Sequence, residues 1–170
     1  MLVVKDVNVK NGFIVSYNIS RFLNMLHIYL LGFEGVQCII FVTSLSEYNQ
    51  KCYEDDETNR MKESLLVFDE IVNSRWFVET PIILFLNKED LFKEKIQNHD
   101  LKVCFPQYSG GNDPKAAIKY IANKFMEKNK NPDLKKIYPH VICATDTTKL
   151  KDVFSEKDIQ EVLLRDDKMV

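Results

Sequence analysis

Short apolar runs alternate with longer segments of helical periodicity along most of this chain. A strand that is buried on both faces of a sheet typically appears as about four to eight consecutive apolar residues. The runs that predict such strands span 36–42, 82–86 and 137–143. The segments that predict helices span 56–74, 91–96, 114–128 and 149–168. Strands separated by helices indicate an α/β fold, with a mostly parallel sheet and helices on both faces.

Local signals set the expected limits of these elements. Within 56–74, an apolar stripe at helical spacing should face the core, widened by Leu66 and Ile71; its members are Met61, Leu65, Phe68 and Val72. Pro139 predicts that the strand over 137–143 pairs only after that residue, because proline has no N–H to donate. Alternating apolar residues over 3–15, with Lys10-Asn11-Gly12 as the turn, predict a hairpin that adds one antiparallel edge strand.

Composition and charge exclude several classes of function. The 170 residues are enough for one domain spanning 1–170, with 45% apolar and 28% charged residues. A net charge of −2 gives no general attraction to nucleic acid, so no nucleic-acid partner is expected. No apolar run reaches membrane-spanning length, and the first ten residues lack the apolar core of a signal peptide. Four scattered cysteines without a CxxC pair are typical of reduced thiols in a cytoplasmic protein.

The spacing of the glycines limits the nucleotide chemistry that these residues can perform. No two of the five glycines fit GxxxxGK(S/T) or GxGxxG. Both of those patterns cradle phosphate groups with backbone N–H donors. The 170 residues therefore contain no phosphate-binding loop of either common kind.

The most suggestive polar cluster follows the apolar run 82–86, where the chain continues with Asn87, Lys88, Glu89 and Asp90. Open α/β sheets bind ligands at the carboxyl ends of their strands. There the Asp90 carboxylate can accept two N–H bonds from a guanine edge, the Asn87 amide can hydrogen-bond the base, and the Lys88 stem can lie over a purine ring. The alternative is a solvated polar turn, and these residues alone do not decide between the two.

A second candidate segment, Cys143-Ala144-Thr145, leaves the strand expected over 137–143. Small residues at this point allow the backbone to approach a planar ligand, and the Ala144 N–H can donate to a keto oxygen. The alternative is a turn in which Thr145 or Asp146 caps the next helix. The two candidate segments are separated by one predicted strand–helix unit, so they can converge on one crevice.

Four stretches of the chain together resemble one family. They are FEGVQCIIFVTSLSEYNQ, DETNRMKESLLVFDEIVNSRWF, TPIILFLNKEDLF and ICATDT. Nearly without gaps from Gly32 to about Phe154, the chain is similar to the C-terminal half of a heterotrimeric G-protein α subunit. The resemblance implies a Ras-like P-loop GTPase fold of which this chain lacks the first strand, the P-loop and the helical insert.

The resemblance also implies a function and a set of partners. The expected function is guanine-nucleotide-binding signal transduction downstream of G-protein-coupled receptors, with GTP or GDP as ligand and Mg²⁺ as the family's metal. Asn87, Lys88 and Asp90 would read guanine, and Cys143, Ala144 and Thr145 would close the base pocket. The segment Asn73 to Phe77 would face effectors, the last helix would engage the receptor, and a βγ dimer would be a further partner. The expected location is cytoplasmic, with the inner face of the plasma membrane as a narrower alternative.

The chain departs from the family pattern just before residue 33. Where members carry Asp-Val-Gly-Gly-Gln and then a basic helix, this chain has Asn18 to Phe22 followed by the apolar stretch 22–31. We therefore expect negligible GTP hydrolysis by this chain, because positioning and charge stabilisation supply most of phosphoryl-transfer catalysis. No catalytic residue and no metal ligand are assigned. The stretch 22–31 is expected either to be buried over the sheet or to form a partner surface.

A second hypothesis keeps the fold without the nucleotide chemistry. In that reading the chain is a pseudo-GTPase interaction module, which docks to a receptor or effector through Arg75, Trp76, Phe77 and the last helix. Nucleotide binding separates the two hypotheses.

Overall fold

The structure, a computed structural model, describes residues 3–5, 12–16, 38–53 and 55–143, together with positions 153, 155 and 160. For 3–5 and 12–16 only the backbone is described. The strands are β1 (Val3–Lys5), β2 (Gly12–Ser16), β3 (Cys38–Ser44), β4 (Ile82–Asn87) and β5 (Ile137–Val141). The α-helices are α2 (Arg60–Val72), α3 (Glu89–Asn98) and α4 (Pro114–Met126), and short 3₁₀ turns are η1 (Leu45–Glu47), η2 (Arg75–Phe77) and η3 (Leu101–Val103).

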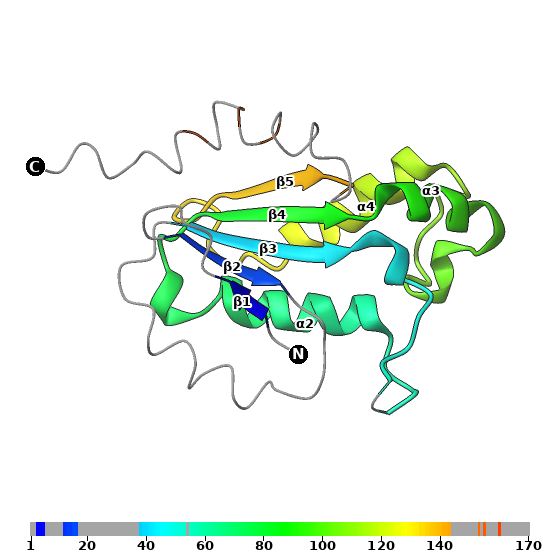
Figure 1. Ribbon diagram of the computed structural model, residues 1–170, viewed down its shortest axis with the longest axis horizontal. Helices are drawn as coiled ribbons and strands as arrows, with labels where there is room; N and C mark the ends of the chain where they lie inside the picture. The colour runs from blue at the N-terminus through cyan, green and yellow to red at the C-terminus, as the bar shows by residue number, and fades with distance from the viewer. Residues whose placement is uncertain are drawn as a thin grey trace, which may run out of the picture.

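One mixed sheet organises these elements (Figure 1). Its strand order is β1-β2-β3-β4-β5, with β1 antiparallel to β2 and every other neighbouring pair parallel. The expectation of a mostly parallel sheet with one antiparallel edge strand is confirmed. The expected turn is wrong in one respect, since Gly12 opens β2 opposite Cys38 and does not lie in the turn.

Both faces of the central strands are buried. On one face, Phe41 of β3 packs with Phe68 of α2 and Phe125 of α4, and the ring centroids of the two helix residues lie 5.3 Å apart. On the other face, Ile40 and Ile83 form a separate cluster with Ile142 and helical Val153. Described helical residues thus lie against both faces, from α2 and α4 on one and at Val153 on the other, as the alternation of strands and helices predicts. Helix α3 follows the carboxyl end of β4 (Figure 1).

Helix α2 is shorter than the span predicted for it, 56–74. It begins at Arg60 because the Asn59 side chain accepts hydrogen bonds from two backbone N–H groups of the first turn, and so acts as the N-cap. The expected start at Asp56 is wrong, since the Asp55 carboxylate holds the preceding residues in a turn. The stripe itself is buried as expected, but Leu66 is 50% exposed and does not widen it.

Pro139 does not delay the pairing of β5. The strand pairs with β4 from Ile137 onward, with Pro139 opposite Leu84, which corrects the expectation that pairing starts after the proline. Backbone groups of residues 136 and 142 bond to β4, so groups at even positions face that strand. The nitrogen of Pro139 belongs to the opposite set and faces away from β4, where no ladder hydrogen bond is lost.

Two cysteines are held in apolar surroundings. Burial raises the pKa of the Cys38 thiol to about 11 and that of the Cys104 thiol to about 12. Cys104 also donates its S–H to the Asn59 side-chain oxygen. Both thiols stay protonated near neutral pH, and buried thiols of this kind react slowly.

A buried lysine gives the fold a dependence on alkaline pH. The Lys135 side chain is 2% exposed and donates to the Val72 carbonyl at the end of α2, and burial lowers its pKa from 10.5 to about 8. Between these two values the unfolded chain binds more protons than the folded chain, so this group makes the free energy of unfolding rise with pH. Below about pH 8 both states are protonated and the burial penalty is fully present.

We therefore predict that the stability of the native chain relative to Lys135→Met shifts in favour of the native chain as pH rises. Urea unfolding between about pH 7.5 and about pH 10 measures this difference. The exposed neighbour variant Lys136→Met serves as the control and should show no such trend. A stability difference that stays constant over this range would contradict the prediction.

Candidate functional site

The turn from β4 into α3 places the predicted polar residues at the carboxyl edge of the sheet. Asn87 is the last residue of β4, and Lys88 adopts a left-handed conformation with φ 61° and ψ 44°. The Lys88 backbone N–H donates to the Asn87 side-chain oxygen over 2.7 Å. Helix α3 begins directly afterwards at Glu89. A single left-handed residue therefore connects the strand directly to the helix and leaves both side chains at the sheet edge.

Backbone hydrogen bonds connect this turn to the end of β5. The Ile142 N–H donates to the Leu86 carbonyl over 2.9 Å, and the Glu89 N–H donates to the Ile142 carbonyl over 3.4 Å. Ile142 is thus bonded to β4 before the turn and to α3 after it. Cys143 follows immediately and is half-buried. The structure brings the end of β5 beside Asn87 and Lys88, while Ala144 and Thr145 lie outside the described residues.

Asp90 lies in the first turn of α3, where its side chain is exposed. A carboxylate is favourable at this position because the helix N-terminus carries a partial positive charge. Within the part of the chain that the structure describes, the Asp90 carboxylate has no hydrogen bond or ion pair. Its oxygens are available to accept hydrogen bonds from a ligand.

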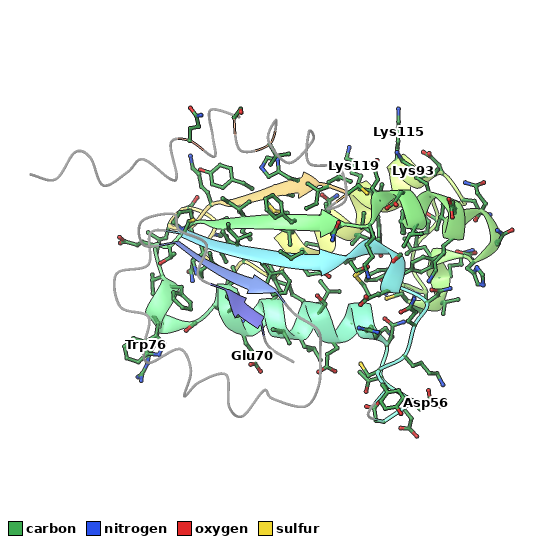
Figure 2. The ribbon with its side chains drawn as sticks, viewed as in Figure 1. Asp56, Glu70, Trp76, Lys93, Lys115 and Lys119 are labelled. Atoms are coloured by element: carbon green, nitrogen blue, oxygen red, sulfur yellow. The ribbon has the colours of Figure 1, made fainter. Side chains whose placement is uncertain are left out.

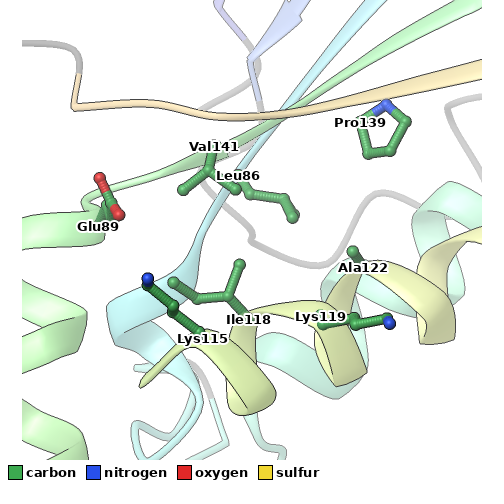
Figure 3. Close-up of a pocket in the computed structure, with 8 residues that line it drawn as sticks. All are labelled: Leu86, Glu89, Lys115, Ile118, Lys119, Ala122, Pro139 and Val141. Atoms are coloured by element: carbon green, nitrogen blue, oxygen red, sulfur yellow. The ribbon is translucent and has the colours of Figure 1, made fainter. Parts of the chain in front are cut away.

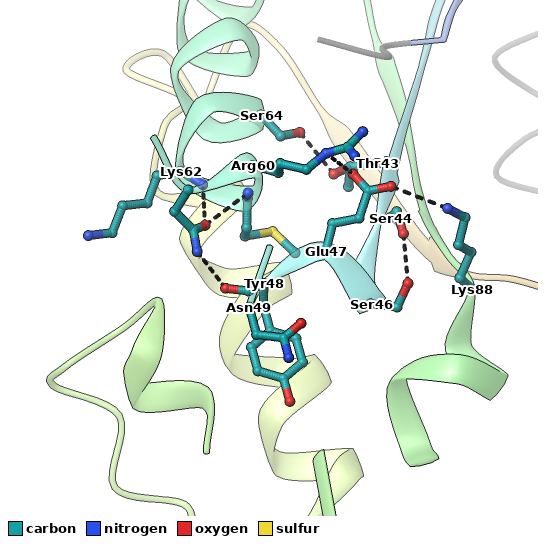
Figure 4. A network of polar contacts seen from close by, with 12 residues as sticks. Thr43, Ser44, Ser46, Glu47, Tyr48, Asn49, Arg60, Lys62, Ser64 and Lys88 are labelled. Carbon is teal, nitrogen blue, oxygen red and sulfur yellow. Dashed lines mark hydrogen bonds and ion pairs between the residues drawn. The ribbon is translucent and has the colours of Figure 1, made fainter. Parts of the chain in front are cut away.

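The Lys88 ammonium is held by a carboxylate from another element (Figure 4). Glu47 of η1 binds Lys88 Nζ through Oε1 at 3.2 Å and Arg60 Nε through Oε2 at 3.1 Å. Its side chain is only 17% exposed, which places both ion pairs in a partly buried setting. Glu47 therefore joins the end of β3 to the start of α2 and to the β4–α3 turn.

Further polar contacts connect β3, α2 and α3 next to Glu47. The Thr43 and Ser64 hydroxyls form a buried hydrogen bond of 2.8 Å between β3 and α2. Lys95 Nζ of α3 donates to the Ser46 carbonyl and to the Asn49 side-chain oxygen. Sequence reasoning missed these residues and Glu47, because their partners lie 13 to 49 positions away and no local motif marks them.

The segment proposed to face effectors divides into an exposed part and a buried part. Arg75 lies over the ring of Trp76, with 4.7 Å from the guanidinium carbon to the ring centroid, and Trp76 is 37% exposed. Phe77 is 3% exposed and packs in the core. Asn73 bonds to Asp69 and to the Lys128 carbonyl, so it braces α2 against the end of α4. Within this turn only Arg75 and Trp76 are exposed. Figure 2 shows Trp76 at the surface.

Several expectations fall outside the described residues. They concern Asn18 to Phe22, the apolar stretch 22–31 and most of the helix expected over 149–168. Of that last segment, Val153 is buried, and Ser155 and Gln160 are exposed. In the described ranges no group of three or more His, Cys, Asp or Glu side chains is arranged to hold a metal ion. Likewise, none of the helices described is both long and apolar enough to cross a membrane.

Comparisons with known proteins agree with this architecture. The family model for the G-protein alpha subunit matches residues 26–163. The chain is 54% identical over 122 residues to the guanine nucleotide-binding protein G(o) subunit alpha of Caenorhabditis elegans, covering 72% of this chain and 34% of that protein. It is 50% identical over 123 residues to the guanine nucleotide-binding protein alpha-17 subunits of Caenorhabditis elegans and Caenorhabditis briggsae, covering 72% of this chain and 35% of each.

The sheet and the matched segments define a protein with the Ras-like GTPase fold of G-protein alpha domains. The chain belongs to the G-protein alpha subunit family. It spans about a third of the length of the curated relatives that it matches. The resemblance inferred from the four sequence stretches is confirmed.

The left-handed conformation of Lys88 leads to a prediction about stability. An L-residue in this conformation costs roughly 1–2 kcal/mol, and glycine avoids that cost. Lys88→Gly loses a partly exposed ion pair worth at most about 1 kcal/mol, so its free energy of unfolding should stay within about 1 kcal/mol of the native value. Lys88→Ile should be clearly less stable than Lys88→Gly, because a β-branched residue tolerates positive φ poorly.

Urea unfolding followed by the fluorescence of Trp76, the single tryptophan, measures both variants. Leu91→Ile, in the helix that follows Lys88, is a control that should change stability little, because Leu91 is 45% exposed. Equal stability of the glycine and isoleucine variants would show that residue 88 is not held at positive φ.

Proposed function

We propose that this chain is a signal transducer of the G-protein alpha class that recognises the guanine base of GDP or GTP at the carboxyl edge of β4. Asn87, Lys88 and Asp90 read the base, and Cys143, Ala144 and Thr145 close its pocket. The observation that carries the proposal is the pair of backbone hydrogen bonds that Ile142 makes, one donated to Leu86 and one accepted from Glu89, which holds the end of β5 against the β4–α3 turn. The printed names of the relatives, guanine nucleotide-binding proteins, support the same ligand.

The chemistry of Asp90 explains the choice of base. Guanine presents two donors side by side, the ring N1–H and the exocyclic N2 amino group, and an ionised carboxylate accepts both. Adenine has an acceptor at N1, so it cannot make this pair of bonds. An exposed carboxylate in the first turn of α3 meets the requirement, because no described group competes for its oxygens.

Lys88 acts through its aliphatic stem. Because Glu47 binds the ammonium at 3.2 Å, the charge is held at one end and the stem is kept near the turn. Four methylene groups can then cover one face of a purine ring while the ammonium stays partly solvated. The Asn87 side-chain oxygen accepts a hydrogen bond from the Lys88 backbone N–H, and this bond orients the Asn87 side chain beside the proposed position of the base.

We assign no catalytic residue and no metal ligand to this chain. Its 170 residues contain no GxxxxGK(S/T) loop to hold phosphates, and base contacts alone provide modest affinity. The Mg²⁺ of the family would be held by phosphates and residues other than those described. We therefore propose base recognition by a single partial Ras-like domain spanning 1–170, with negligible hydrolysis by these residues alone.

The partners that we propose are those expected for a G-protein alpha subunit. An effector would contact the exposed Arg75–Trp76 stack, and a receptor would engage the last helix. A βγ dimer is the further partner of the family, but the surface that would meet it is altered in this chain just before residue 33. The cation–π stack also favours the second candidate function, an interaction module without nucleotide turnover, because Arg and Trp are enriched among the residues that dominate binding energy. Nucleotide binding distinguishes that function from the first.

We predict that Asp90→Ala weakens GDP binding by about tenfold or more, since a hydrogen bond to a charged group contributes about 1.5–3 kcal/mol. Asp90→Asn should instead favour xanthosine diphosphate, whose C2 carbonyl can accept from the new amide. Titration with GDP, xanthosine diphosphate and ADP, followed by amide NMR shifts at millimolar nucleotide, measures these preferences.

Glu94→Ala is the matched control, because Glu94 is another exposed carboxylate of α3. It should leave nucleotide preference unchanged. If the native chain shows no GDP binding at these concentrations, or binds ADP equally well, base recognition is refuted and the interaction module stands.

A further inference from the structure

A groove of about 340 Å³ lies between α4 and β5 (Figure 3). Its apolar floor is formed by Leu86 of β4, Ile118 and Ala122 of α4, and Pro139 and Val141 of β5. None of Asn87, Lys88 and Asp90 lines it. The groove is therefore separate from the surface proposed to read the base, although Leu86 and Glu89 adjoin both.

The alternation of side chains along β5 explains why the groove is open. Ile137, Pro139 and Val141 share the face of β5 that is directed at α4. Ile137 is buried in the main core, whereas Val141 is 37% exposed. The apolar face of the strand thus continues beyond the part that α4 covers. An apolar surface left open in this way is a candidate ligand site.

The rim of the groove carries an excess of positive charge. Lys115 and Lys119, one helical turn apart on α4, both line it. Among the described residues, neither ammonium has a carboxylate within 4.0 Å. The carboxylate of the lining, Glu89, is already paired with Lys93 at 2.6 Å. Figure 2 shows Lys93, Lys115 and Lys119 gathered at the same end of the molecule.

We propose that this groove binds a small amphiphilic anion, with an apolar body on Ile118 and Val141 and its carboxylate at the positively charged rim to which Lys115 and Lys119 contribute. Charge complementarity selects an anion, because the two lysines lack acidic partners among the described residues and Glu89 is neutralised by Lys93. The volume of the groove favours a small molecule, because about 340 Å³ is near the lower end of the range for ligand pockets, roughly 300–1,000 Å³. A peptide segment would extend well beyond it.

Octanoate and octan-1-ol are the matched probes, since they share a chain and differ in charge. In amide NMR titrations of the full chain, octanoate should shift the Ile118, Ala122 and Val141 amides and bind at least about fivefold more tightly than octan-1-ol. The double variant Lys115→Glu/Lys119→Glu should no longer prefer octanoate to octan-1-ol. It should instead bind octylammonium, the cationic probe with the same chain, more tightly than octanoate. Lys62→Glu, an exposed lysine of α2, is the charge control and should behave as the native chain.

Three results would overturn the proposal: equal affinity of the native chain for octanoate and octan-1-ol, shifts centred outside the groove, or an unchanged preference in the double variant. Binding of an acidic peptide without binding of octanoate would also overturn it. Should the double glutamate variant unfold by circular dichroism, Lys115→Gln/Lys119→Gln replaces it, and its preference for octanoate should disappear. Asp90→Ala should leave octanoate binding unchanged, so the result is independent of the nucleotide proposal.

Discussion

Ile142 closes the carboxyl edge of the sheet, and the geometry of the proposed site depends on it. One of its backbone groups bonds to the last buried residue of β4 and the other to the first residue of α3. Because backbone groups buried at a sheet edge need partners, these two bonds fix the position of β5 relative to the β4–α3 turn. Two segments separated by more than 50 residues in sequence are thereby held at one place, where parallel sheets usually bind their ligands.

The second constraint is the carboxylate of Glu47. A partly buried charge must be matched by opposite charge, and here Arg60 and Lys88 provide it from two different elements. This arrangement makes Lys88 part of the fold as well as part of the proposed site. It also explains how a residue in a costly left-handed conformation can be maintained, since the surrounding contacts determine its geometry.

Much of the fold could be predicted from sequence because its signals are local. The apolar run that becomes β4, the start of α4 at residue 114 and the buried stripe of α2 each follow from short-range patterns. The errors arose where longer-range structure decides. Asn59 rather than Asp56 begins α2 because a preceding turn uses the acidic residues, and Pro139 pairs normally because its nitrogen faces away from β4. The polar residues at 87, 88 and 90 stood out as unusual after a buried strand, whereas Glu47 gave no signal, because its partners are brought to it only by the folded sheet.

A crystal structure of the chain grown with GDP would show where the base binds. We expect the guanine base between the β4–α3 turn and the segment after β5, with N1 and N2 within hydrogen-bond distance of the Asp90 carboxylate. A base bound elsewhere, or a separation of Asp90 and Ala144 too large for both to contact one base, would contradict this expectation.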